Sequence, residues 1–479
     1  MNPPSSGVQV QLVTLQIMRD KGIISQAEYD SAVKDISDSV GSQAGAQESV
    51  VVGKWASTLY GFVEADSIID STRSLNDTAG NSLIARGGSA AGDNARVTFG
   101  ARNSRIGFRL KAPEYHSVRA TAMLEMDFLG TQLPIETGPY PPTVSPSPYG
   151  TEAAYLTNPT FRIRHMNLKI ETPIVDILFG QYWQLFGWQP LYNPNTVQIQ
   201  GVAGEVYSRT PQFRISKTVK AYPVTFEMAV AAVRPVQRDS GSPDGEAGLR
   251  LALDSVTALQ TVGSTGTQIS PLSIAGTGLV RQVEVNSFSP TGASEGDNTS
   301  KLTMGGVTAE AFIPVYPATK DNKFTSFALN GEFASGYGIA DMYTGLTGGV
   351  AFPTPTKGTY TPDIDPGIVT FDYAGKLHGI QWTSYLIGAQ WYLPATDGKV
   401  WISGNYSHMN SANTHYYDVG TIGSATSLMA HEDFYDVNFF FDPVPAIRFG
   451  LEYANTRTTY VDGIHATNLR GQFSGFFIF

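Results

Sequence analysis

Over almost its whole length, beginning at Trp55, the sequence alternates apolar and polar residues with a period of two. Tyr435 and Val437, for example, alternate with Asp436 and Asn438. Because successive side chains of a β-strand point to opposite faces, each such stretch predicts a strand with one apolar, aromatic face and one small or polar face. A chain built from such strands must cover many apolar faces, either with a second sheet or with lipid.

The composition favours lipid as the partner of those faces. Charged residues make up 15% of the 479 residues, against about 25% in average soluble proteins, whereas 42% are hydrophobic. The longest apolar run, residues 228–233, is far short of the roughly 18 residues of a membrane-spanning helix. Strands rather than helices are therefore expected to cross the membrane. They must close into a barrel, because an open sheet edge is not stable in lipid.

The connections alternate in length, which supports an antiparallel barrel. Short turns with proline occur at residues 112–117, 172–176, 220–223, 314–322, 394–398 and 442–445. Long polar loops occur at residues 70–95, 131–158, 187–208, 340–376 and 411–432. This layout is typical of outer-membrane barrels, and its spacing predicts about sixteen strands over residues 51–479. A soluble β-sandwich would instead divide into several domains, and no linker occurs after residue 54.

Residues 1–50 differ from the barrel and are expected to form a separate periplasmic segment. Apolar residues from Val8 onward follow helical spacing, and Ser25 with Glu28 forms a capping box that opens a second helix. These features predict a helical hairpin over residues 8–38, followed by a flexible linker rich in Ser, Gly, Ala and Gln. A solvated tail with marginal helix is the alternative, because helices this short are weak alone.

The residue types that carry chemistry point away from catalysis. The chain has no cysteine, which excludes disulfides, iron–sulfur clusters and Cys-ligated zinc. Its 7 histidines show no metal-ligand spacing, and the sequence has no phosphate-binding loop or nucleophile elbow. The net charge of −10 argues against a nucleic-acid partner. We therefore expect no enzyme activity, cofactor or metal. A Ser and a His that converge only in the fold are the alternative that this pattern leaves open.

Several blocks of sequence resemble the DcaP-like outer-membrane porins. They are residues 58–66 (TLYGFVEAD), 101–108 (ARNSRIGF), 161–165 (FRIRH), 179–186 (FGQYWQLF) and 209–214 (RTPQFR). Residues 21–30 are similar to the periplasmic N-terminal segments of such porins. The alternating aromatic strand that ends in Phe479 resembles the signal of proteins folded by the barrel-assembly machinery. The resemblance implies a homotrimeric sixteen-stranded channel in the bacterial outer membrane, in contact with lipopolysaccharide, through which small, mostly anionic organic solutes diffuse passively.

Basic residues concentrate in the part of the chain that carries this resemblance. Residues 96–217 hold 12 Lys+Arg against 8 Asp+Glu, although the whole chain is acidic. Arg105 and Arg109 alternate with Ile106 and Phe108, so strand parity directs both arginines into the lumen. Fixed positive charges that line a pore favour anions. The predicted pore site comprises Arg105, Arg109, Arg162, Arg164, Arg209, Arg214, Trp188 and Glu205.

The surroundings of these arginines leave alternatives open. Arg162 and Arg164 are out of register with His165, which predicts a bulge near His165. One alternative to a pore site is that the arginines only pair with Glu125 and Asp127 inside the wall. The opposite wall is predicted to carry inward carboxylates at Glu227, Glu310, Glu332 and Glu452.

Residues 187–208 are predicted to fold into the lumen as a constriction loop, because Trp188 and its apolar neighbours are unusual in a loop exposed to water. The alternative is an ordinary extracellular loop at a trimer interface. For the whole protein, the alternatives to a porin are a barrel that holds a partner protein in its lumen, as an electron-conduit sheath does, and an adhesin. A narrow lumen would favour the porin, and an open lumen would favour the sheath.

Overall fold

The structure is a computed structural model, and it describes residues 19, 49–52, 55–130, 159–199, 201–236, 240–292, 298–323, 325–414 and 427–479. The chain divides into two compact units, Met1–Glu48 and Ser49–Phe479. Apart from Arg19, the predicted helical hairpin lies outside the described residues, as does the predicted loop at residues 131–158. Within the described ranges, no helix is long and apolar enough to cross a membrane.

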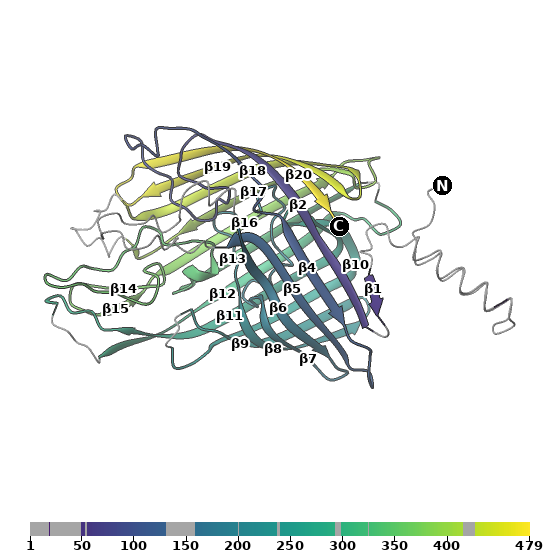
Figure 1. Ribbon diagram of the computed structural model, residues 1–479, viewed down its shortest axis with the longest axis horizontal. Helices are drawn as coiled ribbons and strands as arrows, with labels where there is room; N and C mark the ends of the chain where they lie inside the picture. Colours follow the sequence, from purple (N-terminus) through teal and green to yellow (C-terminus); the bar gives the residue numbers. More distant parts are fainter. Residues whose placement is uncertain are drawn as a thin grey trace, which may run out of the picture. The chain divides into compact units, whose positions relative to one another are not determined.

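The second unit is a closed antiparallel barrel (Figure 1). Its wall strands pair in chain order, and the last strand pairs with β2 to close the ring. β3 and β4 count as one interrupted strand because both pair with β2, which gives sixteen wall strands in the described part of the chain. The strands are β1 Ser49–Val52 (an extension paired with β2), β2 Trp55–Asp70, β3 Arg96–Gly100, β4 Arg105–Lys111, β5 Arg119–Gly130, β6 Thr160–Glu171, β7 Asp176–Trp183, β8 Arg209–Ala221, β9 Val224–Val233, β10 Asp244–Val262, β11 Gly266–Asn286, β12 Thr299–Tyr316, β13 Ser326–Tyr337, β16 Gln381–Tyr392, β17 Val400–Asn410, β18 Met429–Val444, β19 Ile447–Tyr460 and β20 His465–Ile478.

The predicted alternation is confirmed along the wall. In β9, Met228 and Val230 are exposed on the outer face, whereas Ala229 and Ala231 are buried inside. β20, which lies beside β2 in Figure 1, exposes Phe473 and its alternate neighbours in the same way. An apolar outer face together with a closed ladder of backbone hydrogen bonds is what a strand needs in lipid.

The two ends of the barrel differ, as the connection lengths predict. At one end, here called the turn end, strands are joined by short turns such as residues 172–175 and 222–223. At the opposite end, here called the loop end, the connections include residues 71–95 (loop 1), 184–208 (loop 3) and 338–380 (loop 6). Loops 1, 3 and 6 supply the segments that reach the lumen from the loop end.

One predicted boundary is wrong: β18 begins at Met429, inside the loop predicted at residues 411–432. The polar residues that follow Met429 resemble a loop in sequence, but they pair across the sheet. The Asp433 carboxylate lies 2.8 Å from Nδ1 of His408 and accepts a hydrogen bond from the Tyr406 hydroxyl at 3.0 Å. Polar cross-strand pairs extend the sheet here because the strand has left the apolar band.

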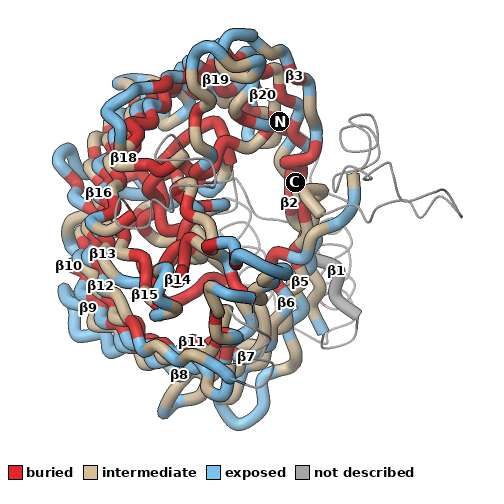
Figure 2. The backbone as a smooth tube through the Cα atoms, turned by 90° about the vertical axis from the view of Figure 1, so that its left-hand side faces the viewer, coloured by how far each residue is buried: buried red, intermediate tan, exposed pale blue. Residues whose placement is uncertain are grey.

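The lumen contains a hydrophobic core of its own. Loop 6 carries the 3-10 helix η1 (Ala340–Met342) and a hairpin of β14 (Val369–Phe371) and β15 (Leu377–Gly379). Their buried side chains pack against Phe186 and Val206 of loop 3. Figure 2 shows these buried segments within the ring of strands. The lumen is therefore partly filled, and loop 3 is packed between loop 6 and the wall.

The seam between β2 and β20 gives the first prediction. Arg470 forms a buried ion pair with Asp70 at 2.8 Å, and the two side chains are only 2% and 1% exposed. Replacing Arg470 by Met leaves the Asp70 carboxylate buried without its cation, and breaking such a pair costs about 3–5 kcal/mol. We expect the free energy of unfolding in urea to fall by that amount, with earlier loss of the heat-modifiable band on gels.

Two controls belong to this experiment. Leu469→Ala changes the neighbouring residue that faces outward, and it should have a much smaller effect. Adding Asp70→Asn to the Arg470→Met variant should recover most of the lost stability, because the stranded charge is then gone. Equal losses in Arg470→Met and Leu469→Ala would show that the ion pair has no special role in closing the barrel.

Candidate functional site

Loop 3 crosses the lumen, and inward carboxylates on three distant strands hold its backbone. Glu452 on β19 accepts hydrogen bonds from the N–H of Val197 at 2.8 Å and from the next N–H at 2.9 Å. Glu332 on β13 accepts the N–H of Val206 at 2.8 Å. Glu246 on β10 accepts the N–H groups of Leu185 and Phe186, near the start of the loop, at 2.8 and 3.2 Å. These acceptors lie far apart around the barrel, so the loop between them spans the interior.

These hydrogen bonds change the role of the inward carboxylates that were predicted on the opposite wall. Glu332 and Glu452 face inward as predicted, but backbone N–H groups of loop 3 occupy one oxygen of each. Glu227 forms an ion pair with Arg250 at 2.9 Å. Three of the four predicted carboxylates of this wall therefore bind loop 3 or pair with an arginine.

Loops 1, 3 and 6 meet at Asn81. The side-chain oxygen of Asn81 accepts the N–H of Gly204, and both its backbone and side-chain nitrogens donate to the carbonyl of Thr344, each at 2.9 Å. The backbone N–H of Tyr207 donates to Met342 O at 2.8 Å. The second half of loop 3 is thereby fixed at the loop end as well as at the wall.

Trp188 anchors the first half of loop 3 against the wall. Its indole N–H donates to the carbonyl of Gly276 on β11 at 3.3 Å. The ring packs in a buried cluster with Leu185 and Tyr192 of the same loop and Ala229 of β9. Its apolar ring therefore covers the inner surface of β9–β11, and Trp188 lines one cavity together with two of the predicted arginines, Arg109 and Arg214.

Three of the predicted arginines form ion pairs with two carboxylates of β5. Arg164 donates to Glu125 at 2.8 Å and to Asp127 at 3.1 Å, and Arg162 contacts Asp127 at 2.6 Å. Arg105 lies 3.5 Å from Glu125. Wall pairing, given above as an alternative, is thus found for these three arginines.

The predicted bulge at the same place is confirmed. The register between β5 and β6 shifts where Glu125 opposes His165 and the next residue of β5 opposes Ile163. Arg164 and His165 are consequently both buried on the inside, at 1% and 2% exposure, although they are neighbours in sequence. The bulge adds a second inward group at this level of the wall.

Positive charge nevertheless exceeds negative charge in this group. Arg209, the first residue of β8, stacks over Trp183 at 4.6 Å and over Tyr207 at 5.1 Å from the ring centres. Its Nη1 atom is buried without a hydrogen-bond partner among the described residues. The basic cluster is defined here as Arg105, Arg162, Arg164 and Arg209. Its first three members pair with the carboxylates Glu125 and Asp127, whereas Arg209 stacks on the two aromatic rings.

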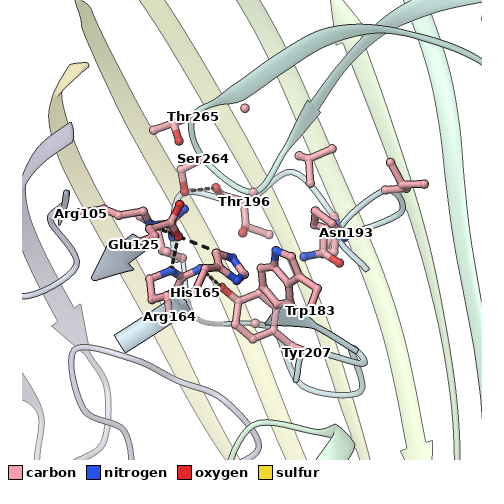
Figure 3. Close-up of a pocket in the computed structure, with 18 of the residues that line it drawn as sticks. Arg105, Glu125, Arg164, His165, Trp183, Asn193, Thr196, Tyr207, Ser264 and Thr265 are labelled. Carbon is pink, nitrogen blue, oxygen red and sulfur yellow. Dashed lines mark hydrogen bonds and ion pairs between the residues drawn. The ribbon is translucent and has the colours of Figure 1, made fainter. Parts of the chain in front are cut away.

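Two members of the basic cluster, Arg105 and Arg164, line a cavity of about 310 Å³ (Figure 3). Its wall side is formed by Arg105, Glu125, Arg164 and His165, and loop 3 closes the other side. Glu205 lines this cavity, but its carboxylate turns back to accept the N–H of Val202 at 2.9 Å, so the predicted site residue is bound within its own loop.

A second cavity, of about 550 Å³, lies toward the turn end and takes the remaining predicted arginines. Arg109 lies over the Tyr60 ring at 5.2 Å from its centre, and Arg214 donates to the carbonyl of Trp183 at 2.6 Å. The two cavities share four lining residues, namely Met123, Tyr182, Pro190 and Leu191. The arginines predicted as one site are therefore arranged in two successive groups along β4–β8.

Two titratable groups of loop 3 lie at the first cavity. Burial raises the pKa of Glu205 to about 8. Burial alone would also raise the pKa of Tyr207, but Arg164, Arg209 and Arg105 outweigh it and lower that pKa to about 8. Both side chains are therefore neutral at pH 7 and become negative over the same range of pH.

Sequence reasoning missed Tyr207 and Glu246. A single tyrosine in a loop has no periodicity, and only its contacts with Arg164 and Arg209 reveal its role. Glu246 is different, because it alternates with Ala247 and Leu249 along one strand. The parity rule that identified Glu332 would have identified Glu246 as another inward carboxylate.

Comparison with known proteins agrees with this geometry. No protein-family model and no curated relative matches the sequence. The outer membrane channel DcaP of Acinetobacter baumannii is similar in structure, with a TM-score of 0.62 and 16% identity over 90% of this chain and 99% of that chain.

Two other barrels match less well. An anion-selective porin of Comamonas acidovorans has a TM-score of 0.46 and 11% identity over 89% of this chain and 100% of that chain. OmpT of Vibrio cholerae in its trimer form has a TM-score of 0.46 and 10% identity over 89% and 99%. Similarity at this level adds nothing to the match with DcaP. The chain thus has the fold of the DcaP outer membrane channel, which confirms the resemblance to DcaP-like porins at the level of the fold.

Proposed function

We propose that this protein is a passive diffusion channel of the bacterial outer membrane for small, preferably anionic organic solutes, with loop 3 as its constriction. The observation that carries the proposal is the set of guanidinium groups at the first cavity, where Arg105 and Arg164 line the space and, together with Arg162, pair with Glu125 and Asp127. The channel fold supplies the context. In this proposal the basic cluster attracts the solute and no side chain reacts with it.

The position of loop 3 supports a passage that runs along β4–β8. The loop is bound to carboxylates of β10, β13 and β19, so it covers the opposite part of the lumen. Space for a solute is found in the two cavities that share Tyr182 and Pro190. We infer that a solute moves from the first cavity to the second between the loop and this wall.

Electrostatics favours an anion on that path. A low-dielectric wall focuses the potential of fixed charges into a narrow pore. Guanidinium groups also bind carboxylate and phosphate through two parallel hydrogen bonds. Glu332 and Glu452 do not oppose this effect inside the passage, because they bind the backbone of loop 3 and line neither cavity. Exposed charges elsewhere are screened beyond about 8–10 Å.

The sheath function requires a different lumen. A partner protein inside the barrel would have to displace loop 3 from Glu246, Glu332 and Glu452, and loop 6 from its buried core with Phe186 and Val206. Cavities of about 310 and 550 Å³ suit a small solute and not a folded chain. The geometry therefore favours the channel.

The assembly is a further part of the proposal. We propose a homotrimer in which outward aromatic residues near the chain ends, such as Phe449 and Phe473, meet lipid and lipopolysaccharide or a neighbouring subunit. Residues 1–50 remain predicted as a periplasmic hairpin and linker, with the barrel over residues 51–479.

Removing two cations from the basic cluster should reduce the anion preference. In the variant Arg105→Gln/Arg209→Gln, each lost charge removes about 1 kcal/mol of attraction at roughly 4 Å. That energy corresponds to about a fivefold change in a binding constant. We expect the anion-to-cation permeability ratio, measured as a reversal potential under a salt gradient, to fall about fivefold or more.

Arg86→Gln is the matched control for this measurement. It removes the same charge from loop 1, where Arg86 forms an ion pair with Asp462 at 2.7 Å, away from the two cavities. Its reversal potential should equal that of the wild type. If the control and the double variant shift equally, selectivity comes from total charge and not from the basic cluster.

The anion preference should also decrease as pH rises from 7 to 9. Glu205 and Tyr207 both have a pKa of about 8, so each becomes negative in this interval and offsets the guanidinium groups. The reversal potential of the wild type should shift toward cations, and the variant Glu205→Gln/Tyr207→Phe should shift much less. An identical pH profile in the two proteins would contradict this role for loop 3.

A further inference from the structure

At the turn end, β10 and β11 continue past the points where they pair with their neighbouring wall strands. The ladder between β9 and β10 ends at Leu253, and the ladder between β11 and β12 begins at Ser273. Between these points, residues 257–271 pair only with each other in the described ladders, after a bulge that follows Leu253. We call residues 257–271 the inner hairpin. Neither flanking strand of the wall continues along it.

The inner hairpin lies inside the barrel. Four successive residues, Ala258 to Thr261, are at most 3% exposed, whereas a wall strand buries only alternate residues. Such a run means that both faces of the hairpin are covered. A bulge is the usual way to turn a strand out of its sheet, and the register shift after Leu253 lies where the turn begins.

Polar contacts trace the course of the inner hairpin across the inside of the wall. The N–H of Leu259 donates to the Ser326 hydroxyl of β13 at 3.0 Å. Farther on, Thr261 and the side-chain amide of Gln390 on β16 exchange two hydrogen bonds, at 2.8 and 2.9 Å. The hairpin therefore passes under β13 and then β16 on its way into the lumen.

The tip of the inner hairpin meets loop 3. The N–H of Gly263 donates to the carbonyl of Pro194 at 3.0 Å, and the Asn195 side chain donates to Gly263 O at 2.7 Å. The Ser264 hydroxyl lies 2.9 Å from the carbonyl of Thr196 (Figure 3). Loop 3 and the hairpin tip thus support each other in the middle of the lumen.

A buried arginine holds the tip from the far wall. Arg448 of β19 donates to Ser264 O at 2.7 Å and to the Thr267 hydroxyl at 3.1 Å. It is fixed in turn by two hydrogen bonds to Asp442, both at 2.8 Å, and by stacking over Trp401 at 4.5 Å from the ring centre. A guanidinium group can donate in several directions at once, which suits it to this clamp.

The same tip forms one side of the first cavity. Thr265 and Gln268 line it together with Arg105 and Arg164 of the basic cluster. Figure 3 shows Thr265 and the two arginines around this cavity. We propose that the inner hairpin is a second constriction element, whose tip sets the width of the passage opposite the basic cluster, and that Arg448 is the residue that positions it. This inference rests on the proposed channel function.

Cysteine labelling tests whether the tip lines the passage. The chain has no cysteine, so Thr265→Cys creates a single reactive thiol. An uncharged methanethiosulfonate reagent added to the open channel should then lower its conductance by about half or more. The control Asp321→Cys places a thiol on an exposed turn between β12 and β13 that lines neither the first nor the second cavity, and its labelling should leave conductance unchanged.

A second experiment tests the clamp. Arg448→Met removes the donors at similar volume, so the tip is released and conductance should rise. Adding Thr196→Cys and Ser264→Cys, whose parent residues are in contact, should restore the wild-type conductance when oxidised, and reduction should release the tip again. If Arg448→Met changed the conductance only by destabilising the barrel, this disulfide would not restore the wild-type conductance.

The outcomes separate this inference from the proposed function. A wild-type protein that does not conduct overturns the channel itself. A conducting channel whose Thr265→Cys variant reacts completely, shown by mass, without a change in conductance overturns the role of the hairpin tip. If Arg448→Met does not fold, the labelling experiment decides alone, because it uses the native Arg448 clamp.

Discussion

The arrangement of the lumen depends on hydrogen bonds between inward glutamates of the wall and the backbone of loop 3. A loop that enters a barrel carries N–H groups away from bulk water, and each needs an acceptor. Glu246, Glu332 and Glu452 supply acceptors on three separate strands. Because these strands lie far apart around the barrel, the three contacts fix the path of the loop across the interior.

This division of the lumen explains how an acidic chain can present a basic passage. The carboxylates of β10, β13 and β19 hold loop 3, and the two on β5 pair with three arginines of the basic cluster. Among the described residues, the cluster thus places four guanidinium groups beside two carboxylates, although the chain as a whole carries a net charge of −10. Position inside the low-dielectric wall, rather than net charge, sets the local potential.

The sequence predicted the barrel well because its signal is repeated in every wall strand. Parity directed Arg105 and Glu332 inward, and broken parity located the bulge at His165. The sequence did not predict which side chains pair with one another. Nothing in the order of residues showed that Arg105 and Arg164 share Glu125, because β4, β5 and β6 acquire their register only when the sheet forms.

Trp188 and the inner hairpin show the same limit. The apolar character of Trp188 indicated packing but not the surface on which it packs. The inner hairpin is continuous in sequence with the wall parts of β10 and β11, and only its missing outer neighbours in the described ladders show that it leaves the wall. Features set by a single segment were thus predictable, whereas features set by contacts between distant strands were not.

The most direct test of the central claim is the reversal potential of the unmodified protein in a planar bilayer under a salt gradient at neutral pH. We expect a small single-channel conductance and a reversal potential on the anion side. A small organic anion that competes for the passage should lower the conductance further. A large conductance with cation preference would contradict it, because loop 3 and the basic cluster would then not form the narrowest part of the channel.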